Sequence, residues 1–248
     1  MADQSNSLEA TTTYYLKTIE SSPIFSNWMY ETIKPYIKGD ILEVGSGLGI
    51  YSRFLYRDFS GKLCLTDIDE NYVAELRREF PTHRVLVEKL DIGSRDDFQL
   101  LRKRSLRYDT IICMNVLEHI NDDVTALREL KRLLKDNGVL ILLVPVHKTL
   151  YNSIDRAVGH FRRYSKQELV LKLQKAGFLI REVFYYNVFG IVGWYLNGNL
   201  LKRQNVDRRA FGFFNRLVPI LQMLDKLPPF RTTGISVIAL CVNCVPPK

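Results

Sequence analysis

The sequence predicts an α/β fold with a doubly wound, mainly parallel sheet and helices on both of its faces. Short apolar runs alternate with amphipathic segments between residues 41 and 145, a glycine-rich turn at 45–49 follows the first run, and an acidic residue, Asp67, ends the second. Strands that alternate with helices form βαβ units, which build parallel sheets. The turn and the carboxylate then mark one edge of that sheet as a ligand site.

The expected strands are short runs rich in aliphatic and β-branched residues. They cover residues 41–44, 63–66, 85–90, 108–114, 139–144, 178–186 and 235–242. The fourth run, YDTIICM, is apolar on both faces, which is typical of a strand in the middle of a parallel sheet.

The expected helices carry apolar residues at helical spacing. They cover residues 10–38, 50–59, 71–80, 95–103, 122–135 and 165–177. In the last of these, Ser165 is placed to cap the start and Gly177 the end. Residues 151–164 are polar and predict a loop.

The segment 191–230 is rich in Phe, Leu, Trp and Arg and separates the last two expected strands. We interpret it as a helical cap insertion within one domain, which comprises residues 1–190 and 231–248. Its apolar residues and flanking arginines also allow peripheral contact with a membrane. Pro219 is expected to interrupt any long amphipathic helix there, which weakens the membrane interpretation.

Composition limits the classes of function. Hydrophobic residues make up 46% and charged residues 25%, which is typical of a globular protein. No apolar run reaches the roughly 18 residues needed to span a bilayer. The polar N-terminal segment also lacks a signal-peptide core, so a cytoplasmic protein is expected. The net charge of +8 suits an anionic partner, but no nucleic-acid-binding motif is present, and nucleic acid is not expected.

The turn GSGLG at residues 45–49 has the features of a nucleotide-cofactor site. Its glycines let the backbone approach a ligand, and Asp67 is spaced to hold two ribose hydroxyls. A dinucleotide loop has the spacing G-x-G-x-x-G, which would require a glycine at Ile50, whereas the third glycine here is Gly49. Asp69 is the nearby alternative to Asp67, although it can instead cap the next helix.

Two further strand ends complete a pattern. Asp91-Ile92 follows the third expected strand, and the motif NVLEHI at 115–120 follows the fourth. With the pattern E-x-G-x-G-x-G that begins at Glu43, these elements resemble the motifs of class I S-adenosylmethionine-dependent methyltransferases. The segment GHFRRYS at 159–165 resembles the G-H-x-R-R-Y-S signature of a subgroup often met near lipid, glycan and natural-product pathways.

The resemblance implies a Rossmann-like, seven-stranded sheet with a terminal antiparallel strand, and S-adenosyl-L-methionine as the cofactor. The residues expected to bind the cofactor are Glu43, Gly45, Ser46, Gly47, Gly49, Asp67, Ile68, Asp91, Ile92, Asn115, Val116 and His119. Tyr15 and Trp28 are expected either to close over the cofactor or to pack in the core. No metal is expected, because the carboxylate cluster of metal-dependent methyltransferases is not assembled in the sequence.

Methyl transfer from a sulfonium is an in-line displacement, so the protein aligns the reacting atoms and can remove a proton from the acceptor. His147 and His160 are the candidate catalytic bases, and each can instead hold loop structure. His119 is a third candidate, for which a structural role is favoured. The residues expected to contact the acceptor are Arg162, Arg163, Tyr164 and Trp194. The two arginines can clamp a carboxylate or phosphate, or pair within the protein.

We therefore expect methylation of a hydroxyl or carboxylate oxygen on a small, partly apolar and anionic metabolite, such as a natural product. A first alternative is a lipid- or glycan-linked acceptor at a membrane surface. A second is a nicotinamide-dependent oxidoreductase, which Ile50 disfavours. A third is a non-catalytic module that binds a cofactor or a partner. The oligomeric state stays open.

Overall fold

The computed structural model describes residues 2–80, 83–103, 106–228 and 230–244 and contains a seven-stranded sheet in the order β3-β2-β1-β4-β5-β7-β6. The strands are β1 (Ile41–Val44), β2 (Leu63–Asp67), β3 (Val85–Lys89), β4 (Tyr108–Met114), β5 (Leu134–Pro145), β6 (Leu179–Tyr186) and β7 (Ser236–Val242). β1 to β5 run parallel, and β7 runs antiparallel to both of its neighbours, β5 and β6. The predicted Rossmann-like sheet with an antiparallel last strand is confirmed.

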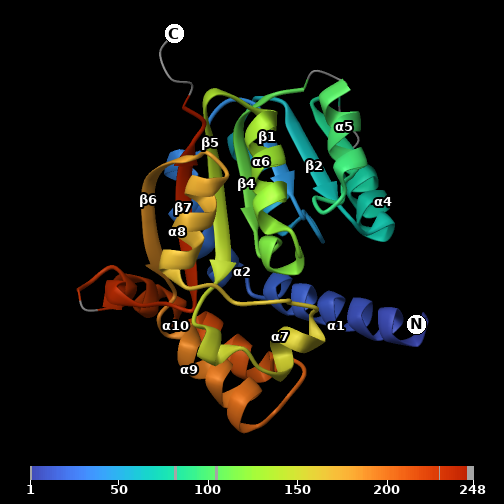
Figure 1. Ribbon diagram of the computed structural model, residues 1–248. Coiled ribbons are helices and arrows are strands. Elements are labelled where there is room, and N and C mark those ends of the chain that lie inside the picture. The colour runs from blue at the N-terminus through green and yellow to red at the C-terminus, as the bar shows by residue number, and fades with distance from the viewer. Residues whose placement is uncertain (1, 81–82, 104–105, 229, 245–248) are drawn as a thin grey trace.

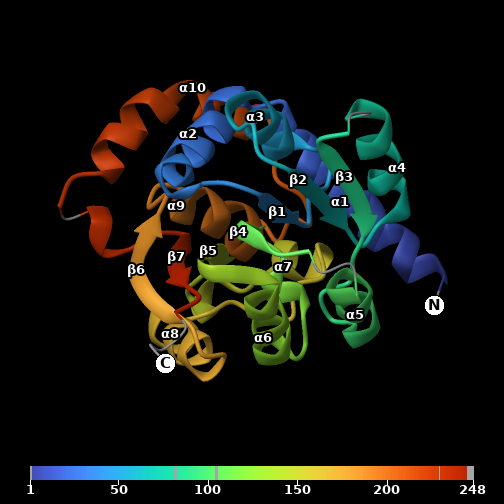
Figure 2. The same ribbon diagram turned by 90° about the horizontal axis from the view of Figure 1, so that it is seen from above.

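Helices cover both faces of this sheet (Figure 2). They are α1 (Ala2–Glu20), α2 (Pro23–Ile33), α3 (Ile50–Asp58), α4 (Glu70–Glu79), α5 (Arg95–Lys103), α6 (Asp123–Leu133), α7 (Ser153–Ala157), α8 (Lys166–Lys175), α9 (Gly190–Trp194) and α10 (Arg208–Asp225). A π-helical turn, Tyr195–Leu200, continues α9, and short 3-10 turns lie at Lys34–Tyr36, Leu117–His119, Lys148–Leu150 and Phe230–Thr232.

The strands bury both faces, so the sheet separates two apolar cores. Successive side chains of a strand point to opposite faces. Leu42 and Val44 accordingly pack in the core that contains buried residues of α5, α6 and α8, whereas Ile41 packs with those of α2, α3, α4 and α10. This two-sided burial explains why the strands read as continuous apolar runs.

The segments that connect the strands place several helices at one edge of the sheet. The arrowheads of β2 and β5 point toward this edge, and α1, α7 and α9 lie beyond it (Figure 1). It is the edge at which the parallel strands have their carboxyl ends, where open α/β sheets bind ligands. The strand order reverses between β1 and β4, which makes this edge of the sheet the expected site.

The segment 10–38 is helical as predicted, but it is divided just before Pro23, where Ser21 and Ser22 separate α1 from α2. Two other sequence-based expectations about local structure are wrong. The segment 151–164 contains a helix, α7, which Asn152 and Asp155 start with a reciprocal capping box. Pro219 does not end the helix of the predicted cap, since α10 continues through it.

The elements between β6 and β7 begin with α9 at Gly190 and end with the 3-10 turn Phe230–Thr232. We call this stretch, residues 190–232, the cap segment. Its separation from the rest of the chain as an insertion at 191–230 stays a prediction. Among the described residues, none of the helices combines the length and the hydropathy that crossing a bilayer requires.

Candidate active site at the carboxyl ends of the strands

The glycine turn after β1 has the backbone that only glycine adopts at no steric cost. Gly45, Gly47 and Gly49 have φ values of 72°, 50° and 72°, in the left-handed region. A Cβ atom on Gly45 would lie 2.4 Å from Cγ2 of Val116, which follows β4. The turn therefore passes directly against the motif at the end of the neighbouring strand.

Glu43 supports this turn from within the protein. Its buried carboxylate accepts hydrogen bonds from the hydroxyls of Ser46, at 3.3 Å, and of Ser52 on α3. Burial raises the pKa of Glu43 to about 7, and the two serine hydroxyls oppose that rise. Ser46 is also buried, so both residues support the turn from the interior of the protein.

Asp67 joins the end of β2 to the same turn. Its carboxylate accepts hydrogen bonds from the backbone N–H of Gly47 at 2.8 Å and of Asp69 at 3.0 Å. Burial raises the pKa of Asp67, while these backbone donors oppose the rise. Asp69 instead caps α4, accepting from the N–H of Asn71, so the two carboxylates have different structural tasks. Ile68 between them is 58% exposed and offers an apolar surface beside Asp67.

The two other predicted strand ends differ in how open they are. Asp91 after β3 is half-buried and accepts from the N–H of Gly93 at 2.7 Å, whereas Ile92 is buried in the core. Asn115 after β4 is exposed, with φ at 53°, and Val116 is half-buried. Asn115 and Asp91 thus present polar groups at this edge, while Ile92 contributes packing.

A cluster of three ionisable side chains lies at the end of β4, and we call it the Glu118–His119–His160 cluster. One ligand-type atom from each residue lies within 4.8 Å of the others. The rings of His119 and His160 meet edge to face at 4.7 Å between centroids, and Nε2 of His160 lies 3.6 Å from Oε1 of Glu118. Two backbone hydrogen bonds hold His160 here. Its own N–H donates to the carbonyl of Asp155, and the N–H of Phe161 donates to the carbonyl of Glu118.

Burial sets the charge preferences in this cluster. Glu118 is fully buried, and burial raises its pKa to about 7, against the opposing influence of His160. Burial also lowers the pKa of His119 to about 4, and the neighbouring His160 adds to that effect. His119 is therefore a neutral imidazole near pH 7.

Asp155 on α7 organises the far side of the cluster. Its buried carboxylate lies 2.8 Å from Nδ1 of His160 and 2.9 Å from Nε of Arg163. Burial alone would raise the pKa of Asp155, but the hydrogen bond from His160 and the charge of Arg163 hold it below its usual range. Since an ionised carboxylate only accepts, Nδ1 of His160 carries the proton and Nε2 faces Glu118.

The two aromatic residues that were expected to close over the cofactor, or to pack in the core, lie in different places. Tyr15 on α1 meets Trp194 on α9 edge to face at 6.5 Å, and burial raises its pKa to about 12. The charges of Arg163, Glu118 and Asp155 also act on the pKa of Tyr15, so this residue lies near the cluster. Trp28 instead packs in the core against Tyr186, at 4.7 Å between rings. Of these two residues, Tyr15 lies near the candidate site and Trp28 lies in the core.

The last part of the GHFRRYS segment, from Arg162 to Tyr164, makes contacts within the protein. Arg162 binds Asp123 at 3.0 Å, and Arg163 is buried on Asp155 beneath the ring of Trp194. Tyr164 is fully buried, with its hydroxyl 2.9 Å from Asp123. The expected arginine clamp is therefore engaged within the protein, and the tyrosine hydroxyl does not reach the site edge.

His147 lies apart from the cluster. It follows β5, its Nε2 lies 2.9 Å from the hydroxyl oxygen of Thr233, and its ring stacks on Tyr185 of β6 at 6.0 Å. Glu118, by contrast, was not among the predicted site residues, although it lies inside the recognised NVLEHI motif. Its position between Leu117 and His119 was visible, but its burial against His160 was not, because that contact joins segments far apart in sequence.

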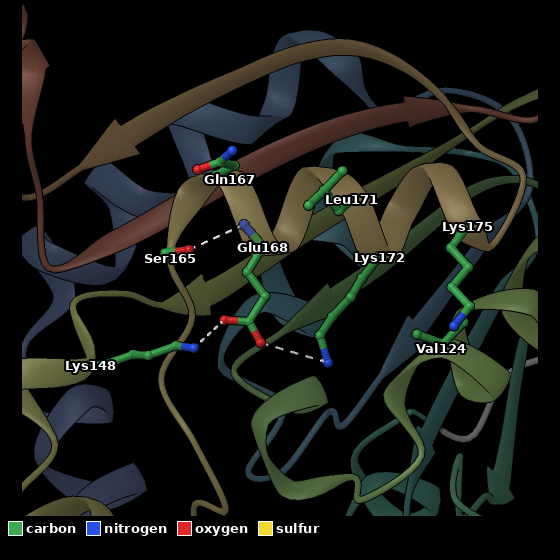
Figure 3. Close-up of a pocket in the computed structure, with 8 residues that line it drawn as sticks. All are labelled: Val124, Lys148, Ser165, Gln167, Glu168, Leu171, Lys172 and Lys175. Carbon is green, nitrogen blue, oxygen red and sulfur yellow. Dashed lines mark hydrogen bonds and ion pairs between the residues drawn. The ribbon is translucent and has the colours of Figure 1, made fainter.

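A separate hollow of about 430 Å³ lies between α6 and α8 (Figure 3). Glu168 forms its polar centre, with an ion pair of 2.7 Å to Lys148 and one of 3.8 Å to Lys172. None of the cluster residues and none of the glycine turn lines it. We therefore place the functional site at the strand ends and not in this hollow.

Comparison with known proteins shows the family to which this fold belongs. A methyltransferase domain model matches residues 13–183, more than half of the chain. A "probable S-adenosylmethionine-dependent methyltransferase" of Mycobacterium tuberculosis is 27% identical over 172 residues, which are 66% of this chain and 60% of the relative. A "probable polyketide synthase" of Dictyostelium discoideum is 25% identical over 161 residues, which cover 57% of this chain but 6% of that protein. The chain thus spans less than two thirds of these relatives.

Solved structures share the fold at low sequence identity. One chain from the Haloferax volcanii complex between the Trm112 methyltransferase activator and a protein described as a methyltransferase has a TM-score of 0.64, with 16% identity and 98% of both chains covered. An S-adenosylmethionine-dependent methyltransferase from Mesorhizobium loti has a TM-score of 0.57, with 13% identity and coverage of 86% and 95%. With the glycine turn, Asp67 and the open edge beside Asn115, the chain belongs to the methyltransferase domain family, and its cofactor is S-adenosylmethionine.

Proposed function

We propose that this protein transfers the methyl group of S-adenosylmethionine to an oxygen atom of a small, partly apolar acceptor. The observation that carries the proposal is the contact between Gly45 and Val116, which brings the cofactor turn against the strand end that holds the Glu118–His119–His160 cluster. A cofactor seated on the turn therefore has polar, buried groups beside it at which an acceptor can be aligned.

The bound cofactor supplies a methyl group that its positively charged sulfur has already activated. The protein has to hold the acceptor oxygen in line and stabilise it while its proton departs. His160 is the residue we assign to contact that oxygen, because Asp155 fixes its ring and leaves Nε2 directed into the cluster. His147 is not retained in this role, since it is bound to Thr233 elsewhere.

The acceptor class follows from the side chains around the cluster. Tyr15 and Trp194 bring aromatic surface from α1 and α9, which favours an acceptor with an apolar or aromatic body. The match to a polyketide synthase supports a natural product of that kind. An anionic acceptor is less favoured than the sequence suggested, because Arg162 and Arg163 are already paired.

Methylation of an acceptor panel tests this proposal. The protein is incubated with methyl-labelled S-adenosylmethionine and with phenols, aliphatic hydroxy acids and hydroxylated polyketides, and the position of the label is read by NMR. We expect His160→Ala to lower kcat about 100-fold or more while cofactor affinity is kept. His83→Ala, which changes an exposed histidine, is the matched control. Label on carbon or nitrogen would contradict oxygen transfer, and no labelled product would favour a binding function.

A second candidate function is methylation of a lipid-linked acceptor at an anionic membrane surface. One face of α10 packs on α2, where Phe211 and Phe214 contact Phe25. Its opposite face exposes an apolar stripe at helical spacing, with Phe213 at 64%, Ile220 at 61% and Met223 at 68%. The cap segment carries seven basic and two acidic residues, a net charge of +5 within a chain of +8. An apolar face surrounded by positive charge suits contact with the surface of an anionic membrane.

Sedimentation with lipid vesicles tests this second candidate. We expect binding to vesicles of phosphatidylcholine mixed with phosphatidylserine, little binding to phosphatidylcholine alone, and about tenfold weaker binding after Ile220→Ser with Met223→Ser. Leu171→Ser on α8 is the control, since Leu171 is equally exposed at 59% but lies outside the cap segment. Equal binding by all variants, or self-association through α10 in the absence of lipid, would overturn the assignment.

A further inference from the structure

The Glu118–His119–His160 cluster combines one carboxylate and two imidazoles, a donor set that suits metal ions. The three ligand-type atoms lie within 4.8 Å of one another, and Glu118 and His119 are adjacent on one 3-10 turn. A cation with bonds of about 2.1 Å holds its ligand atoms roughly 3 to 3.5 Å apart. Binding of one ion by all three residues would therefore draw their ligand atoms closer together by side-chain rotation.

The orientation of His160 directs its second ring nitrogen toward Glu118. Asp155 accepts the Nδ1 proton at 2.8 Å, so the opposite nitrogen, Nε2, is the ring atom that faces Oε1 of Glu118 at 3.6 Å. At this separation the two atoms are beyond hydrogen-bond distance. A ligand-type atom of His119 lies within 4.8 Å of both, so three potential ligand atoms surround one small region.

The carboxylate of Glu118 provides a second, independent observation. It is 0% exposed, and neither of its oxygens has a hydrogen-bond partner. Buried carboxylates are normally paired, hydrogen-bonded or coordinated to metal. Here the fold gives a dry carboxylate an ion pair of 3.6 Å with His160 but no hydrogen bond, so a closer partner is expected within the cluster.

We propose that Glu118, His119 and His160 bind a divalent first-row transition cation. Imidazole favours such ions over magnesium, and a carboxylate with two histidines leaves coordination positions open. The hydrogen bond from His160 to Asp155 is the outer-shell carboxylate contact that commonly orients a metal-binding histidine. Asp155 is in turn fixed by Arg163, so the support for the site is buried as well.

The site lies next to the cofactor turn, since Val116 of the same strand end contacts Gly45. An ion there would have an open position for an oxygen of the acceptor, which it would orient and make more acidic. His160 would then act on that oxygen as a ligand of the ion and not by direct contact. This use of the ion rests on the proposed function, whereas binding of the ion does not. Metal binding and methyl transfer are therefore measured separately.

Titration of the chelator-treated full chain with Co²⁺ and with Mn²⁺, without cofactor or acceptor, tests the site. Visible absorption of bound Co²⁺ reports nitrogen ligation, and calorimetry gives the stoichiometry. We expect one ion per chain, with affinity reduced at least tenfold by His119→Ala and by His160→Ala. Two controls should bind as the unmodified chain does: His83→Ala removes an exposed histidine and Cys244→Ser an exposed thiol.

Glu118→Gln keeps the size of the side chain and removes its charge, so it serves if a histidine variant does not fold, as judged by circular dichroism. It should also reduce Co²⁺ affinity at least tenfold. Absence of stoichiometric binding, or binding that survives in all three cluster variants, would overturn the proposal. Binding of Co²⁺ without any methyl transfer would keep the metal site and count against the proposed function alone.

Discussion

At the scale of single residues, Asp67 is the side chain on which cofactor affinity should depend most. Backbone N–H groups of Gly47 and Asp69 hold its carboxylate, and a carboxylate can accept about four hydrogen bonds, so it can still accept from ribose hydroxyls. Each hydrogen bond to a charged group contributes about 1.5–3 kcal/mol. We expect Asp67→Asn to weaken S-adenosylmethionine binding by about 10- to 100-fold in a calorimetric titration.

The matched control for that experiment is Asp69→Asn. Asp69 caps α4 through the N–H of Asn71, so its replacement should lower stability slightly and leave cofactor affinity unchanged. If the two variants exchanged these effects, the ribose would belong to Asp69. Two neighbouring aspartates with opposite readouts separate ligand binding from helix capping.

Glu43 should make stability depend on pH. Its pKa is about 7 in the folded protein and 4.5 without the fold, so the folded state holds one more proton between these values. The stabilisation is fully present below pH 4.5 and is lost as the pH rises through 7. Its slope is about 1.4 kcal/mol per pH unit in this window.

Glu43→Gln removes this titration and keeps a hydrogen-bonding group beside Ser46 and Ser52. We expect the free energy of unfolding, measured in urea at a series of pH values, to fall less steeply with pH in the variant. Glu118 titrates in both proteins and cancels from the difference. An unchanged slope would mean that Glu43 does not gain its proton on folding.

At the scale of elements, α10 shows how packing overrides a local rule. A proline inside a helix removes one backbone hydrogen bond and crowds the preceding turn. The helix nevertheless continues through Pro219, because Val218 is buried and Phe211 and Phe214 hold the first half against Phe25. Tertiary contacts of that kind join α10 to a helix almost 200 positions earlier, so sequence periodicity did not reveal them.

Replacement of Pro219 should therefore strengthen α10. Proline costs about 3 kcal/mol in a helix interior, partly offset because it restricts the unfolded chain by about 1 kcal/mol. We expect Pro219→Ala to raise the free energy of unfolding by about 1–2 kcal/mol in urea denaturation. Gly212→Ala, where a Cβ meets nothing within 4 Å, measures helix propensity alone and should add about 1 kcal/mol. A loss of stability in Pro219→Ala would show that α10 is bent to fit α2.

Features set by a contiguous run of residues could be predicted from the sequence, whereas features set by distant contacts could not. The strand at 108–114 was predicted to the residue, because buried parallel strands carry their signal in a contiguous run. The strand-end positions of Asp67 and Asn115 followed from topology. Tyr164 and Arg163 were misassigned because their partners, Asp123 and Asp155, are 41 and 8 positions away and only folding brings them together.

At the scale of the whole molecule, one buried ion pair joins three regions that close the site. Arg163 binds Asp155 on α7, donates to the carbonyl of Val146 after β5 at 3.1 Å, and lies 4.6 Å beneath the ring of Trp194 on α9. Both charged side chains are almost fully buried. The cap segment is thus fastened to the strand end through the same carboxylate that orients His160.

Breaking this pair should loosen the cap segment together with the site. Removal of one partner from a buried ion pair costs about 3–5 kcal/mol, because the other charge stays buried. We expect Arg163→Met to lower stability by that amount and to speed hydrogen exchange in α7 and α9 more than in β1 and β2. Arg156→Met is the control, since Arg156 is an exposed arginine on α7, the helix that carries Asp155. Uniformly faster exchange would mean that Arg163 supports the whole fold. Faster exchange confined to α7 and α9 would mean that Arg163 holds the cap segment in place at the carboxyl ends of the strands.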